Sequence, residues 1–316
     1  MRNYSHVMKG IIWAAFASFS WGISGTVLQL ISQNLSIPAD WMLSTRLSFT
    51  GMIILIFCAF RYGKPTLNVF RDRTSCLSVI SYAIFGLGMN LLTFYFAVQT
   101  GNASMATILQ YLAPLFIVAG NVFFKRQMPL RSDVIAFVLA LVGVFLCLTR
   151  GEFDHLSISF ISLLWGLGSG LTAALYVVLP QRAVAKNPPL VVLGWGSMIA
   201  GVIFNFYHPF WINTPHITPV LVSSVATVIF FGTILPFGML LHASKFAPSD
   251  VVSIMDAVQP ITTSILSVIF FSLHLNVYEI VGIIIVLLAI YILQRGRRQP
   301  PADFKAISSD EENMHY

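Results

Sequence analysis

Ten apolar runs follow one another along the chain and are separated by short polar turns. A helix that crosses the hydrocarbon core of a bilayer needs about 20 apolar residues. We interpret all ten runs as helices, because an open sheet cannot satisfy its backbone in lipid and the alternation of a barrel strand is absent. The predicted spans are 10–32, 39–60, 75–98, 102–124, 132–149, 157–180, 188–207, 217–242, 248–272 and 277–294.

The composition supports a membrane protein over a soluble one. Of 316 residues, 57% are hydrophobic and 9% are charged, and the mean hydropathy is +0.81. Soluble domains carry roughly 25% charged residues, which they need to cover their surface. The first run follows Arg2 and Lys9 as a signal peptide would, but it is long enough to span, so we expect an uncleaved helix. The sequence predicts an all-α, multi-pass protein of the cell membrane.

The placement of the cations predicts the orientation. All but two of the 18 lysines and arginines lie in the N-terminal segment, in alternate turns or in the tail; the exceptions are Arg46 and Arg150. Such segregation marks the cytoplasmic side, so we expect both termini in the cytoplasm and an even number of helices. It also accounts for the net charge of +6 without a nucleic-acid partner. Residues 295–316 are expected to form a cytoplasmic tail whose basic start favours anionic lipid headgroups.

The two halves of the chain share one pattern. An offset of 146 residues aligns Thr107 with Ser253, Gln110 with Asp256 and Pro114 with Pro260, and an offset of 144 aligns Trp21 with Trp165. Helices of residues 1–150 therefore resemble those of residues 151–294. Because each half has five helices, the halves enter the membrane in opposite directions. Inverted repeats of this kind are typical of secondary transporters, which place a site near the midplane and rock around it.

Three segments carry a resemblance to a known family. They are Ser20-Trp21-Gly22, the stretch from Asn102 to Pro114 (NASMATILQYLAP), and the stretch from Asp256 to Pro260 (DAVQP). In order and spacing the chain, to about Gln294, resembles the drug/metabolite transporter superfamily and its EamA-type ten-helix members. The resemblance implies alternating-access transport of a small polar metabolite, with an amino acid or amine as the favoured cargo and export as the favoured direction. We expect a monomer or a homodimer.

Asp256 is the one acid deep inside a predicted span. A carboxylate at membrane depth is costly, and it usually faces the bundle interior and marks a pathway. On its helix it shares a polar stripe with Ser253, and Thr107 and Gln110, with Tyr111 adjacent, form the matching stripe in the first half. We therefore expect a central cavity in which Asp256 binds substrate and couples transport to protons. The alternative is a protonated Asp256 that only joins helices.

The roles of the other candidate residues depend on how deep they lie in the predicted spans. We expect Trp21 and Trp165 to line the cavity, although packing or an interfacial belt is open for both. Tyr176 lies on the face of Trp165, and Gln259 stands where family members often carry glutamate, so no coupling role follows for it. Asn90 is expected either to line the cavity or to bond two helices. Pro114 and Pro260 are expected to act as hinges.

Arg46 has three possible roles in the second span. It could extend outward to the membrane surface, bind a carboxylate, or pair with another helix; we favour a structural or external-gate role.

Other functional classes fit the sequence less well. The seven histidines and three cysteines form no metal-binding motif, so no metal or cofactor is expected. An intramembrane enzyme would need paired acids or a nucleophile with its base, and Asp256 has no second acid in its span. The principal alternative is an uptake or exchange carrier for an organic cation or drug, which aromatic rings beside a carboxylate could hold.

Overall fold

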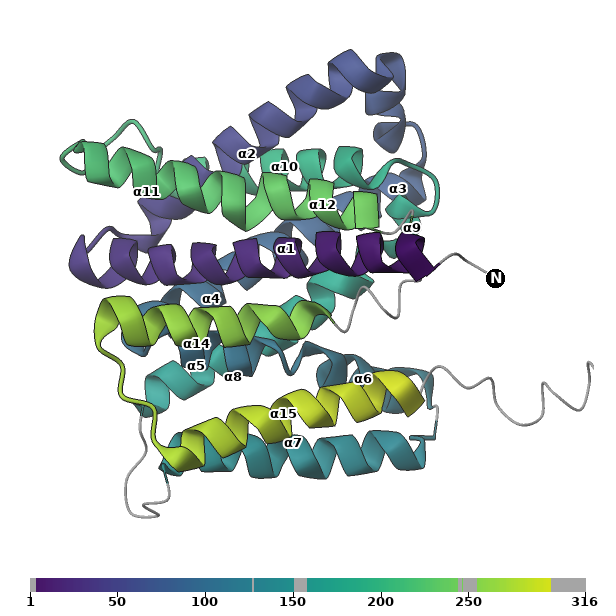
Figure 1. The fold of residues 1–316 in the computed structure, drawn as a ribbon. Helices are drawn as coiled ribbons and strands as arrows, with labels where there is room; N and C mark the ends of the chain where they lie inside the picture. Colours follow the sequence, from purple (N-terminus) through teal and green to yellow (C-terminus); the bar gives the residue numbers. More distant parts are fainter. Residues whose placement is uncertain (1–3, 127, 151–157, 244–245, 247–254, 297–316) are drawn as a thin grey trace, which may run out of the picture.

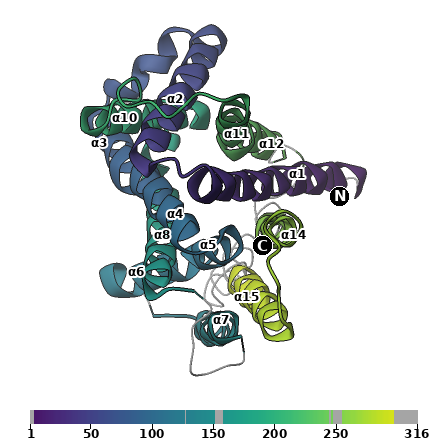
Figure 2. The ribbon, with the colours of Figure 1, turned by 90° about the vertical axis from the view of Figure 1, so that its left-hand side faces the viewer.

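The computed structural model describes residues 4–126, 128–150, 158–243, 246 and 255–296 (Figure 1). Within these residues the protein consists of helices and has no strand. Most of the helices lie roughly parallel or antiparallel to one another, as the end-on view shows (Figure 2). This is the arrangement expected of a bundle that crosses a membrane.

The first half begins with the long α1. Its elements are α1 (Tyr4–Gln29), the π-helical turn η1 (Leu30–Asn34), α2 (Ala39–Tyr62), the 3₁₀ helix η2 (Lys64–Phe70), α3 (Arg73–Ser81), the π-helical η3 (Tyr82–Gly88), α4 (Met89–Thr100), α5 (Ala103–Gln110), α6 (Ala113–Lys125) and α7 (Arg131–Thr149).

The second half runs from α8 to α15. Its elements are α8 (Phe160–Val178), the short α9 (Gln181–Val184), α10 (Pro189–Tyr207), α11 (Pro219–Ile229), the π-helical η4 (Phe230–Ile234), α12 (Leu235–Ala243), the 3₁₀ turn η5 (Met255–Ala257), α14 (Val258–Phe271) and α15 (Val277–Gly296).

Nine helical segments of the described residues are long and apolar enough to cross a membrane. A tenth apolar helix, Met255–Phe271, is shorter. Each predicted span overlaps one of these ten segments within a few residues, except that residues 248–254 lie outside the described part of the chain. The prediction of an all-helical, multi-pass membrane protein is confirmed.

Six helix pairs make the main contacts. The helices α7 and α15 pack together, as do α2 and α10; α4 packs on α8, and α1 packs on α12; α1 also contacts α14, and α8 also contacts α5. Figures 1 and 2 accordingly show α1 between α12 and α14, with α7 and α15 side by side at one edge.

Glycines bring several of these helices into close contact. A Cβ atom added to Gly143 of α7 would lie 2.8 Å from the carbonyl oxygen of Gly282 in α15. A Cβ atom on Gly22 of α1 would lie 2.6 Å from Thr262 of α14, and one on Gly166 of α8 would lie 2.3 Å from Leu109 of α5. Small residues serve this purpose in membranes, where helix association depends on close van der Waals packing.

Some of the spans are interrupted rather than continuous. We expected one helix over 102–124, but α5 ends at Gln110 and α6 begins at Ala113, next to Pro114. Proline lacks an N–H and is tolerated in the first turn of a helix, so it marks the start of α6. In the second half, η5 likewise precedes α14, whose third residue is Pro260. Two other spans contain the π-helical segments η3 and η4.

An ion pair joins two polar turns at one end of the bundle. Lys186 Nζ lies 2.8 Å from Asp72 Oδ2, and Asp72 also accepts hydrogen bonds from Thr74 and Ser75. Lys186, followed by these hydroxyls, holds the pKa of Asp72 well below its usual range. A lowered carboxyl pKa stabilises the fold at neutral pH, and that contribution is lost as the pH falls through about 4 and below. Because both side chains are well exposed, solvent screens the pair and the contribution is small.

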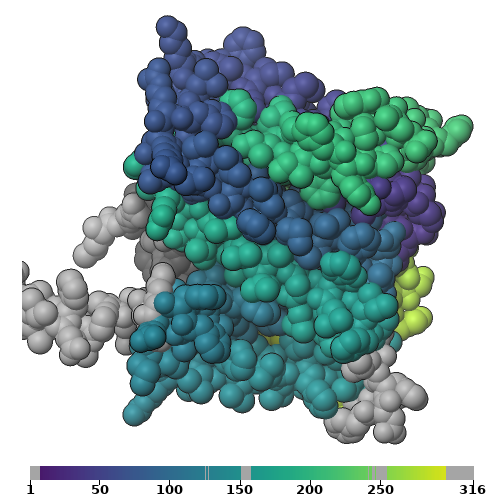
Figure 3. All heavy atoms as spheres, turned by 180° about the vertical axis from the view of Figure 1, so that it is seen from behind, coloured from purple at the N-terminus to yellow at the C-terminus, as the bar shows by residue number. Residues whose placement is uncertain are grey.

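The outer surface of the bundle is largely apolar. Seen from behind, residues of the middle of the chain, in blue, teal and green, cover most of one face, and the purple start of the chain shows at its edge (Figure 3). Large side chains that are about half exposed or more include Phe57, Leu141, Phe145, Phe206 and Ile269. Such a surface would aggregate in water and suits contact with lipid.

The contact between Gly143 and Gly282 gives a test of the helix packing. We expect Gly143→Ala to lower the melting temperature of the detergent-purified protein, because overpacking costs about 1–3 kcal/mol. Gly120→Ala is the matched control, since a Cβ atom there would meet nothing within 4 Å. Thermal unfolding followed by tryptophan fluorescence measures both; equal melting temperatures for the two variants would contradict the close contact.

Candidate functional site

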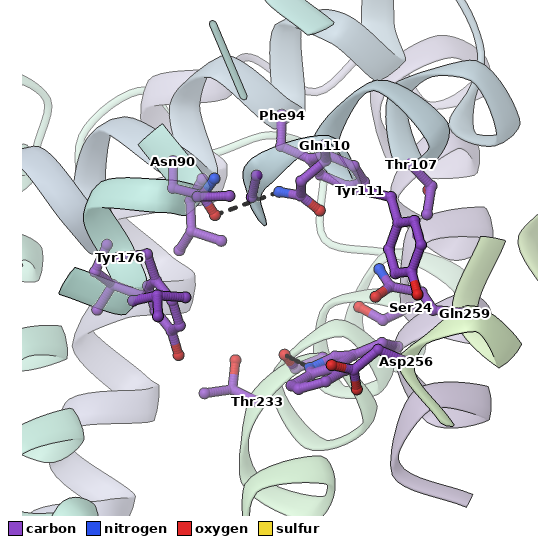
Figure 4. Close-up of a pocket in the computed structure, with 18 of the residues that line it drawn as sticks. Ser24, Asn90, Phe94, Thr107, Gln110, Tyr111, Tyr176, Thr233, Asp256 and Gln259 are labelled. Carbon is purple, nitrogen blue, oxygen red and sulfur yellow. Dashed lines mark hydrogen bonds between the residues drawn. The ribbon is translucent and has the colours of Figure 1, made fainter. Parts of the chain in front are cut away.

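A cavity of about 290 Å³ lies between the helices and is lined from both halves of the chain. Its polar and charged lining residues from the first half include Ser24, Arg46, Asn90, Thr107, Gln110 and Tyr111. Those from the second half include Tyr176, Thr233, Asp256, Gln259 and Gln294. Figure 4 shows Asn90 and Gln110 on one side of the opening, across from Thr233 and Asp256.

Asp256 lies in η5, directly before α14, and lines the cavity. The hydroxyl of Ser18 on α1 donates to Asp256 Oδ1 at 3.3 Å, and Ser18 itself is fully buried. This single hydrogen bond to a neutral donor leaves most of the acceptor capacity of the carboxylate free. Among the described residues that line the cavity, Asp256 is the only acid.

A network of amides and hydroxyls forms another wall. Gln110 Nε2 donates to Ser169 Oγ at 3.1 Å and approaches Asn90 Oδ1 at 3.4 Å. Asn90 Nδ2 in turn donates to the carbonyl oxygen of Ser169 at 3.1 Å and to Thr172 Oγ1 at 3.3 Å. The network joins α4, α5 and α8, so Asn90 fulfils both of the roles that we left open: it lines the cavity and it bonds helices.

Aromatic rings close the remaining sides. Trp21 Nε1 donates to the carbonyl oxygen of Gly232 at 3.1 Å, and the indole meets Phe237 edge-on with centroids 6.0 Å apart. Tyr176 packs between Tyr82 and Phe237. In Figure 4 the ring of Tyr111 stands near Asp256, and that of Tyr176 stands on the opposite side of the cavity. The rings are fixed by these contacts and present rigid surfaces to the cavity.

Arg46 also reaches the cavity. Its side chain is 7% exposed, and it approaches the carbonyl oxygen of Gly232 at 3.4 Å and Thr233 Oγ1 at 3.3 Å. The residue therefore does not extend outward to the membrane surface. It is the only lysine or arginine among the described residues that line the cavity.

Most of the predicted site residues meet at this cavity. Trp21, Asn90, Thr107, Gln110, Tyr111, Tyr176, Asp256 and Gln259 all line it. Trp165 is absent from the described lining; its indole packs on Phe96 with ring centroids 4.9 Å apart. Ser253 lies outside the described residues. Of the two hinge candidates, Pro114 lines the cavity and Pro260 is buried beside it in α14.

Sequence reasoning missed several lining residues. Ser24, Phe94, Thr233 and Phe237 were not candidates. Ser24 lies three residues after Trp21, on the same face of one helix turn, and that spacing could have identified it. Thr233 lies in the π-helical η4, where the ordinary 3.6-residue period does not apply, so no stripe pointed to it.

The fold and the cavity define a class of protein: a helical membrane protein with a polar cavity among its spans, as transporters have. The EamA-like transporter family matches residues 8–149 and 160–295, and the chain belongs to this family. The resemblance to EamA-type transporters is thereby confirmed.

Individual relatives agree with this assignment. The chain is 28% identical over 296 residues to the inner membrane transporter YicL of Salmonella typhimurium, covering 92% of this chain and 97% of the relative. It is 33% identical over 129 residues, 40% of each chain, to the threonine/homoserine exporter RhtA of Escherichia coli K12. A solved crystal structure matches with a TM-score of 0.60 at 15% identity, over 94% of this chain and 99% of the other.

The positions of the two tryptophans generate a prediction. We expect Trp21→Ala to weaken ligand binding at least about tenfold, because truncating a cavity aromatic costs the ~1.5–3 kcal/mol of its buried contacts. Trp165→Ala should leave binding within about twofold, since its indole packs on Phe96 outside the lining. Isothermal calorimetry on both purified proteins measures the difference, and equal losses in the two variants would place Trp165 at the ligand as well.

Proposed function

We propose that this protein is a secondary transporter that exports a small polar metabolite, of amino-acid size, across the cytoplasmic membrane by alternating access. The observation that carries the proposal is the cavity, because polar and charged side chains from both halves of the chain line one space among the spans. Transporters built from inverted repeats bind their substrates at such a repeat interface.

The proposed repeats comprise residues 1–150 and 151–294, with both termini in the cytoplasm. The packing supports them, because exchanging each span of one half for its counterpart in the other reproduces the same contacts. The pair of α1 and α14 becomes the pair of α8 and α6; α4 with α8 becomes α12 with α1. The pairs of α2 with α10 and of α7 with α15 map onto themselves. The family likewise matches two segments of similar length.

The interruptions support the same repeats. The offset of 146 residues that aligns Gln110 with Asp256 also aligns Gly86 in η3 with Gly232 in η4. It further aligns the break after Tyr111 with Ala257, the end of η5. Broken helices in corresponding positions of two halves are typical of transporters and mark their binding sites.

The size and lining of the cavity favour a small metabolite. Ligand pockets have volumes of about 300–1,000 Å³, and a cavity of about 290 Å³ lies at the lower end of that range, which favours a small cargo. RhtA, which matches part of this chain, is named as an exporter of threonine and homoserine. An organic cation, the second candidate, would suit Asp256 and the nearby aromatic rings, but Arg46 in the same cavity opposes a cargo that is only positively charged.

Asp256 is proposed as the residue that couples transport to protons. A carboxylate that lines the cavity can take a proton on one side of the membrane and release it on the other. Its single hydrogen-bond donor, Ser18, suits both states, because a hydroxyl can donate to the charged form and accept from the protonated form.

Asp256→Asn tests this coupling. In inside-out vesicles with an imposed pH gradient, we expect gradient-driven uptake of radiolabelled L-threonine to fall at least about tenfold, because the amide cannot carry the proton. Asp40→Asn is the control, since Asp40 is absent from the cavity lining. A variant that accumulates substrate with an unchanged pH dependence would rule out Asp256 as the coupling group.

A further inference from the structure

Arg46 is a buried charge that the fold does not neutralise. It lies seven residues into α2, about 10 Å along the helix from its first residue. Its side chain is 7% exposed, its Nε has no hydrogen-bond partner, and no ion pair joins it to a carboxylate among the described residues. A buried cation in this situation is costly unless an anion completes its environment.

The contacts of Arg46 position the guanidinium but do not neutralise its charge. Both acceptors, the Gly232 carbonyl and the Thr233 hydroxyl, are neutral, and distances of 3.4 and 3.3 Å lie beyond those of charge-assisted hydrogen bonds. A Cβ atom on Gly232 would lie 3.0 Å from Arg46 Nη2 and 2.4 Å from Ser24 Oγ, so a larger residue there would displace one or both of these side chains. Trp21 donates to the same carbonyl, which fixes its position beside the cavity.

Arg150 shows how the same chain secures a structural arginine. Arg150 Nε lies 2.9 Å from Glu279 Oε1, and the carboxylate is itself buried and accepts the backbone N–H of Asn276. Arg46 has no such acid among the described residues, and the one acid in the described lining of its cavity, Asp256, is hydrogen-bonded to Ser18 instead. The described lining therefore contains one cation and one anion that do not pair with each other.

The geometry points to a zwitterionic amino acid as the cargo, with Arg46 binding its carboxylate and Asp256 binding its ammonium group. The inference rests on the proposed function and names its substrate class. A guanidinium presents donors in a planar fork that matches a carboxylate, and its charge is then neutralised by the cargo. An ammonium group in turn supplies donors for the free acceptor capacity of Asp256. A cargo with both charges satisfies both residues at once.

Removing either charge from the ligand tests the inference on the unmodified protein. The purified protein is titrated with the twenty standard amino acids, and then with the amino alcohol and the N-acetyl derivative of each one that binds. We expect both derivatives to bind about 10- to 100-fold more weakly, since a hydrogen bond to a charged group contributes ~1.5–3 kcal/mol. An amino alcohol that binds as well as its parent would overturn the carboxylate site, while the proposed transport of a polar metabolite would stand.

Variants of Arg46 locate the carboxylate site. Arg46→Gln should weaken binding of the amino acid about 10- to 100-fold and reduce its advantage over the amino alcohol to about twofold or less. Arg46→Lys, which keeps the charge and loses the fork, should fall between. Lys186→Gln removes a cation outside the cavity and should leave the ratio of the amino-acid affinity to the amino-alcohol affinity unchanged. An undiminished ratio in Arg46→Gln overturns the assignment; if that variant does not fold, the ligand titration alone decides.

The remaining outcomes separate this inference from the proposed function. If amines, nucleobases or sugars bind and are transported while no amino acid is, the assignment of a zwitterionic cargo is wrong and the proposed transport function stands. If proteoliposomes transport none of these compounds, both proposals fail.

Discussion

Polar groups within the hydrocarbon layer must find partners inside the protein, and the arrangement of this chain depends on that requirement. The connection between α4 and α5 illustrates it. The side chain of Gln33 donates to the carbonyl oxygens of Val98 and Gly101, and the side chain of Gln29 accepts the backbone N–H of Ala103. Two glutamines of the first span thereby satisfy the backbone where the chain turns from one span into the next. Side chains on one helix support the turn between two of its neighbours.

This satisfaction is incomplete at the cavity. Other polar side chains bond to each other across helices, as Ser104 and Ser264 do at 2.6 Å between α5 and α14. Around the cavity, by contrast, Arg46 keeps an unpartnered Nε and Asp256 has one neutral donor. Buried polar groups without partners are expensive in a low-dielectric interior. A ligand that supplies the missing partners gains that energy on binding, which is how a structure of few charges can select its cargo.

The two proposed repeats resemble each other more in their contacts between helices than in their side chains. Gly22 and Gly166 lie in corresponding spans. Gly22 packs against Thr262 of its partner helix, and Gly166 packs against Leu109 of its partner helix. The adjacent tryptophans differ in environment: Trp21 lines the cavity, whereas Trp165 packs on Phe96. Close backbone packing restricts a position to glycine in both halves, but it places no such restriction on which residues line a cavity. The scaffold can stay symmetrical while the binding surface becomes asymmetrical.

The sequence by itself determined the ten spans, the membrane class and a set of candidate site residues, most of which line the cavity. Apolar length and the segregation of cations are properties of the chain, and the cost of Asp256 at membrane depth follows from its position alone. Only the tertiary structure decided where Arg46 points, that Trp165 stays out of the lining, and that Thr233 enters it. The position of Thr233 depends on the π-helical η4, which rotates side chains away from the regular helical period, and those of Arg46 and Trp165 depend on what their helices pack against. Such rotations come from contacts between helices distant in sequence, and a pattern read along one helix does not contain them.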